Sequence, residues 1–79
     1  MSAYDYYGEA KALAEALKSA GFPDYGAEIV RAMEEGETGT EIFMIMRARL
    51  GGVLAAGQLP SDLMTRVEAL YGKLDSALT

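Results

Sequence analysis

The sequence predicts an all-α domain, a compact bundle of four short helices with short connecting loops. Apolar residues recur at spacings of three and four along four separate segments, and this is the periodicity of one face of an α-helix. Glycine or proline separates the segments from one another, as expected at helix ends. No run of β-branched residues alternates with a period of two, so strands are not expected.

The first two helices are predicted over residues 5–20 and 24–35. The apolar stripe of the first consists of Tyr6, Ala10, Leu13, Leu17 and Ala20. Gly21 suits the position after the helix, because a left-handed backbone costs glycine little. Asp24 is expected either to cap the second helix or to lie in its first turn. Gly36 is expected to end that helix.

The last two helices are predicted over residues 40–56 and 61–78. Thr38 and Glu41 have the Thr-x-x-Glu spacing of a capping box, and Thr40 is the alternative cap. Ser61 is expected to cap the last helix. Asp62 and Arg66 lie four residues apart, which favours an ion pair along the helix surface.

The length and the short connections indicate one domain. A chain of 79 residues is long enough for a single small core. The predicted loops are short, so consecutive helices are expected to be antiparallel neighbours. Several glycines fall inside predicted helices; these are Gly8, Gly26, Gly51, Gly52 and Gly72. The pair Gly51 and Gly52 is expected to allow close packing within the bundle, and a kink in the third helix or the approach of a second copy are the alternatives.

The acidic composition restricts the choice of partner. There are 12 acidic against 7 basic residues, for a net charge of −5. Nucleic acids and anionic membranes reward clustered Lys and Arg, so neither is an expected partner. An acidic surface attracts basic proteins.

No segment approaches the roughly 18 apolar residues of a membrane span, and the N-terminal residues lack the pattern of a secretory signal. We therefore expect a cytoplasmic protein, or else a mature form whose signal has already been removed.

The side chains needed for common catalytic and metal sites are missing. The sequence contains no histidine and no cysteine. Without them, Ser–His and Cys–His nucleophile pairs cannot form, nor can the usual zinc sites. No glycine-rich phosphate loop follows a strand. The sequence therefore predicts a protein that is not an enzyme, with no cofactor and no metal.

Three features exceed what a simple bundle needs. The five apolar residues of the run 42–46 point all around one helix, which indicates either a central helix or an interface with another chain. Glu34, Glu35, Glu37 and Glu41 form an acidic cluster. Glu41 suits the beginning of the third helix, whereas Glu34 and Glu35 lie at the unfavourable end of the second, where Arg31 is expected to offset part of the charge. In the N-terminal group, a helix that begins as early as Tyr4 would place Tyr6 in the core and Tyr4 and Tyr7 together on another face.

These features favour a non-enzymatic protein-interaction module. A concrete version is a small acidic inhibitor or immunity-type protein that masks a basic partner. The residues predicted to bind that partner are Glu34, Glu35, Glu37, Tyr4, Tyr7 and Met44.

Two other interpretations stay open. The chain could form a homo-oligomer through its third helix, as a structural or assembly protein would. It could also be a helix-turn-helix regulator built on the second and third helices. The charge opposes the regulator, because Arg47 and Arg49 are two residues apart and point to different sides of a helix.

Overall fold

The computed structural model describes residues 3–79, which form four α-helices and no strand. Helix α1 spans Tyr6–Ser19, α2 spans Pro23–Glu35, α3 spans Gly39–Ala56 and α4 spans Ser61–Leu78. The predicted all-α class is therefore confirmed. Each predicted helix is present, and no end is displaced by more than one residue.

Side chains cap two of the helices. Before α1, the Asp5 carboxylate accepts a hydrogen bond of 2.9 Å from the N–H of Gly8. Before α3, the Thr38 hydroxyl oxygen accepts a bond of 3.2 Å from the N–H of Glu41, and the hydroxyl donates to the Glu41 carboxylate at 3.3 Å. Each cap satisfies a backbone donor that has no partner within the helix. Thr38, rather than the alternative Thr40, is therefore the cap.

The other two helices begin without a side-chain cap. Phe22 occupies the N-cap position of α2, Pro23 is the first helical residue, and Asp24 lies in the first turn. Pro60 occupies the N-cap position of α4 with an extended ψ of 154°. The expectation that Ser61 caps α4 is therefore wrong, because Ser61 is already inside the helix.

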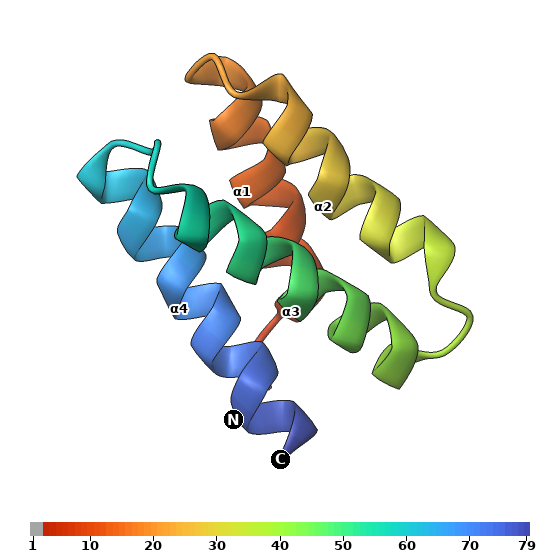
Figure 1. Cartoon of the computed structure of the whole chain (residues 1–79). Helices are drawn as coiled ribbons and strands as arrows, with labels where there is room; N and C mark the ends of the chain where they lie inside the picture. Colours follow the sequence, from red (N-terminus) through yellow and green to blue (C-terminus); the bar gives the residue numbers. More distant parts are fainter. Residues whose placement is uncertain (1–2) are drawn as a thin grey trace.

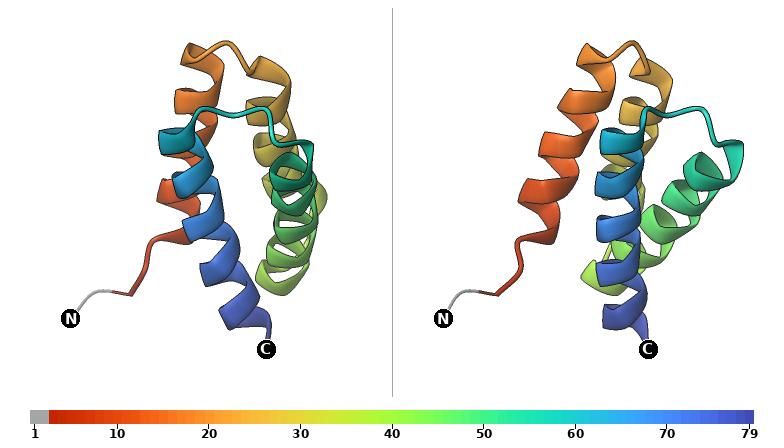
Figure 2. Two further views of the ribbon diagram at one scale, coloured as in Figure 1. Left: turned by 60° about the vertical axis from the view of Figure 1, so that its left-hand side comes forward. Right: turned by 90° about the vertical axis from the view of Figure 1, so that its left-hand side faces the viewer.

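The helices form a ring of neighbours. α1 packs against α2 and α4, and α3 packs against the same two helices, while the diagonal pairs do not pack backbone to backbone. Consecutive helices run in opposite directions, as the short loops predict (Figure 1). The α2–α3 loop lies at the same end of the bundle as the first turn of α1 and the last turn of α4 (Figure 2).

The core is made of apolar side chains from all four helices and the α3–α4 loop. Its buried members are Ala10, Leu13, Ala14, Leu17, Ile29, Ala32, Met46, Leu50, Val53, Leu59, Leu63, Val67, Leu70 and Leu74. In the run 42–46, Met46 is buried, Met44 is exposed, and the other three residues are partly buried against the core. The run is thus largely explained by packing of α3 between α2 and α4.

Small residues bring α1 and α2 close together. A Cβ atom placed on Gly26 would lie only 2.7 Å from the carbonyl oxygen of Ala14, a separation that real Cβ atoms do not tolerate. Gly51 faces the ring of Tyr71 on α4, where an added Cβ would lie at 3.4 Å. Gly26 and Gly51 therefore allow close packing, which was predicted for Gly51. The same prediction is wrong for Gly52, where an added Cβ meets nothing within 4 Å, as at Gly72.

Candidate protein-binding surface

Aromatic rings connect α1 to α3 across the bundle diagonal. The ring centroid of Tyr6 lies 4.5 Å from that of Phe43, and the centroid of Tyr7 lies 6.0 Å from it. The hydroxyl of Tyr7 reaches the first turn of α3, 3.6 Å from where Gly39 would carry a Cβ. Tyr6 is half-buried and packs against the core, as predicted. Tyr7 stays 39% exposed and covers the beginning of α3.

Tyr4 lies on the opposite side of this aromatic group, toward α4. It precedes α1, its ring meets Tyr6 edge-on at 4.8 Å, and the Lys73 ammonium lies 5.1 Å from its centroid. Burial raises the pKa of the Tyr4 hydroxyl, and the charges of nearby acidic groups, chiefly Glu9, raise it further. The expectation that Tyr4 and Tyr7 share one helix face is wrong, because α1 begins at Tyr6 and Tyr4 therefore lies outside the helix.

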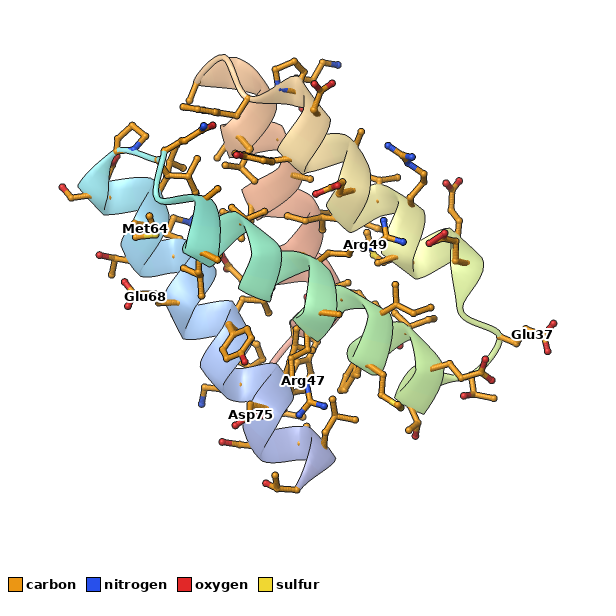
Figure 3. The ribbon with its side chains drawn as sticks, viewed as in Figure 1. Glu37, Arg47, Arg49, Met64, Glu68 and Asp75 are labelled. Atoms are coloured by element: carbon orange, nitrogen blue, oxygen red, sulfur yellow. The ribbon has the colours of Figure 1, made fainter. Side chains whose placement is uncertain are left out.

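The three predicted acidic residues have three different environments. Glu34 borders a hollow between α1 and α2. Glu35 accepts a hydrogen bond of 3.0 Å from the Arg49 guanidinium. Glu37 lies in the α2–α3 loop and points away from the bundle (Figure 3). They do not form one continuous cluster, and Arg49 rather than Arg31 offsets the charge near the end of α2.

The two arginines of α3 bind different neighbouring helices. Arg47 donates to Asp75 of α4 at 2.8 Å, whereas Arg49 donates to Glu35 of α2 at 3.0 Å (Figure 3). Their side chains diverge, as the two-residue spacing predicts. Both guanidinium groups are engaged within the bundle, so they do not form one basic face on α3.

Met44 stands on the outer face of α3. It is 52% exposed, the largest exposure among the bulky apolar residues described. Glu41 lies three residues earlier and is therefore on the same side of the helix. Further along this side the exposed residues are small and uncharged; they are Ala48, Gly52 and Ala55.

A hollow of about 410 Å³ between α1 and α2 was not predicted from the sequence. Its apolar floor includes Val30, which is 42% exposed, and its other apolar members are Ala14, Pro23, Gly26 and Ala27. Four charged residues border it, namely Glu15, Lys18, Arg31 and Glu34. The sequence holds one indication of this hollow: Val30 lies beside, rather than on, the stripe formed by Tyr25, Ile29 and Met33.

Of the six predicted binding residues, the structure gathers three around the beginning of α3. Tyr7 covers the inner side of the first turn, Glu37 precedes the helix, and Met44 lies on the outer side beyond Glu41. We call Tyr7, Glu37, Glu41 and Met44 the acidic end. Within residues 3–79, neither of its carboxylates has a Lys or Arg within ion-pair distance.

Residues 3–79 contain neither a metal-binding group of side chains nor a membrane-spanning helix. No three carboxylates within residues 3–79 are grouped so that they could hold a metal ion. None of the helices described has the length and apolarity needed to cross a membrane. Comparison of the chain with protein-family models, with curated proteins and with solved structures finds no match.

Proposed function

We propose that this protein is a non-enzymatic interaction module that binds a basic protein through its acidic end. The observation that carries the proposal is the exposed Met44 on the same side of α3 as the Glu41 carboxylate, with Glu37 in the preceding loop and the exposed Tyr7 at the other side of the first turn; neither carboxylate has a basic partner within ion-pair distance among the residues described. Such a surface offers both contact area and charge to another protein.

The two kinds of side chain would have separate roles. Tyrosine supplies a large, rigid contact area at small entropic cost, and methionine adapts to irregular partner surfaces. Carboxylates at the margin of an interface accelerate association with a basic surface and orient it. A small inhibitor or immunity-type protein that covers the basic surface of another protein would use this combination.

Two changes in the acidic end test the proposal. Glu37→Lys reverses an exposed charge, and Glu41→Gln removes a charge while keeping a side chain suited to the capping box. The matched control combines Glu68→Lys with Asp62→Asn, which also reverses one exposed glutamate and neutralises one first-turn carboxylate. Both double variants change the net charge by the same amount.

The measurement is affinity capture from the source cell with the wild-type chain and the two double variants, followed by mass spectrometry. We expect the wild type and the control to retain the same basic protein, and the acidic-end variant to lose it. Retention by the wild type should also weaken as salt rises, because charges at an interface margin are screened. Equal retention by both double variants would rule out the acidic end as the binding surface.

A further inference from the structure

The hollow between α1 and α2 is bordered by charged groups that have no partner within residues 3–79. Glu15 and Lys18 come from α1, and Arg31 and Glu34 come from α2. None of them takes part in the three ion pairs of the described chain. Between them lies an apolar floor on which Val30 is 42% exposed. An apolar floor surrounded by charged side chains that have no partner is the composition expected of a protein interface.

The order of the charges follows from the packing of the two helices. α1 and α2 are antiparallel, and the contact between Gly26 and Ala14 places these residues at the same level. Residues after Ala14 therefore lie toward the α1–α2 loop, and residues well after Gly26 lie toward the other end. Starting from that loop, the charged side chains follow with alternating sign in the order Lys18, Glu15, Arg31 and Glu34.

This alternating order is complementary to itself. A two-fold axis that lies in the interface and crosses the helices obliquely, roughly perpendicular to the line from Lys18 to Glu34, reverses the order in a second copy and sets α1 of each chain against α2 of the other. Lys18 of each chain then faces Glu34 of the other, and Glu15 of each chain faces Arg31 of the other. The two charges on each helix are three residues apart, about 4.5 Å along the axis. Because this spacing is the same on both helices, one two-fold arrangement brings both kinds of pair within reach.

We infer that the protein forms a symmetric homodimer in which the α1–α2 hollows of two copies face each other. Val30 and its counterpart lie in the apolar centre, and four ion pairs surround them. A second copy is the occupant that the charges favour, since symmetry alone supplies the matching pattern. This dimer uses a different surface from the acidic end, so it does not depend on the proposed function.

Charge-swap variants test the inference directly. Glu15→Arg and Arg31→Glu are each expected to raise the dimer dissociation constant by about tenfold or more, because the two-fold axis repeats every like-charge contact. An equimolar mixture of the two variants should form a heterodimer. The new guanidinium at position 15 of one chain faces the new carboxylate at position 31 of the other, while the native Arg31 and Glu15 face each other at the second contact.

The measurement is sedimentation equilibrium of the full chain from about 1 µM to about 1 mM, a range that covers weak association. Circular dichroism confirms that each variant is folded, and Glu68→Arg on the exposed side of α4 is the control that should still dimerise. The dimer should weaken at about 1 M salt, where the screening length is about 3 Å. A wild type that stays monomeric, or a mixture of folded variants that does not associate, would overturn the inference.

Discussion

The guanidinium of Arg66 in α4 donates a hydrogen bond of 3.0 Å to the carboxylate of Glu9 in α1, across 57 residues of sequence. This ion pair joins the first helix to the last. Both side chains are more than a third exposed, at 40% for Arg66 and 37% for Glu9. Water and salt therefore screen the attraction, and its contribution to stability should be small.

Replacement of Arg66 by methionine should lower the free energy of unfolding by about 0.2–1 kcal/mol at low salt. Methionine retains an unbranched chain that can pack on the helix surface, so the loss should come mainly from the charge. Urea denaturation measures the change, and a double-mutant cycle with Glu9→Gln isolates the pair. A coupling energy that does not decrease at about 1 M salt would contradict this account.

Gly26→Ala should destabilise the fold by about 1–3 kcal/mol, because the added methyl overpacks the α1–α2 contact. Its Cβ would lie 2.7 Å from a backbone oxygen of Ala14, which cannot move away as a flexible side chain can. The helices must separate to accept it. Thermal or urea unfolding measures the loss.

The matched control for this substitution is Gly52→Ala. Gly52 also lies inside a helix, but an added Cβ meets nothing within 4 Å. Alanine should therefore stabilise the protein by about 0.5–1 kcal/mol through its higher helix propensity. If both substitutions change stability in the same direction, the close approach at Gly26 is not what determines its effect.

Local signals predicted the helices well, whereas partners distant in sequence could not be predicted. Thr38 and Glu41 form their capping pair three residues apart, within the range that a sequence pattern can describe. Arg66 was expected to pair with Asp62 along α4, yet its partner is Glu9 in α1. The i,i+4 rule considers one helix alone, and tertiary packing provided a different carboxylate.

The candidate site shows the same limitation. Glu34, Glu35 and Glu37 were predicted to form a single cluster together with Glu41, because the four residues are close in sequence. The end of α2 and the start of the loop give each of the first three carboxylates a different direction: toward a hollow, toward Arg49, or away from the bundle. The backbone path thus decides which charges share a surface.

The raised pKa of Tyr4 predicts a loss of stability at alkaline pH. The ordinary tyrosine pKa is 10.0, and burial together with nearby Glu9 raises the pKa of Tyr4 in the folded chain. Unfolded chains then release the proton first, so the contribution of Tyr4 is fully present below pH 10 and is lost as pH rises through the folded pKa.

Tyr4→Phe isolates this contribution, because it keeps the ring and removes the titrating hydroxyl. The phenolate absorbance of the wild type should continue to rise at high pH after that of the variant has levelled off. Unfolding experiments should show a smaller alkaline loss of stability for the variant. Two titrations that end at the same pH would show that Tyr4 is not shifted.

Met44→Asp distinguishes the two possible interfaces for self-association, which are the α1–α2 hollow and the outer face of α3. Met44 is 52% exposed on the outer face of α3 and does not border the α1–α2 hollow, so a carboxylate there should leave the homodimer unchanged. The fold should also be little affected, within about 0.5 kcal/mol for an exposed position.

The matched variant is Val30→Asp, which places the same charge on the floor of the hollow. Sedimentation equilibrium compares the dimer dissociation constants of the two variants. We expect only the Val30 variant to become monomeric, since a buried unpaired carboxylate opposes association. The reverse result would place the interface on α3.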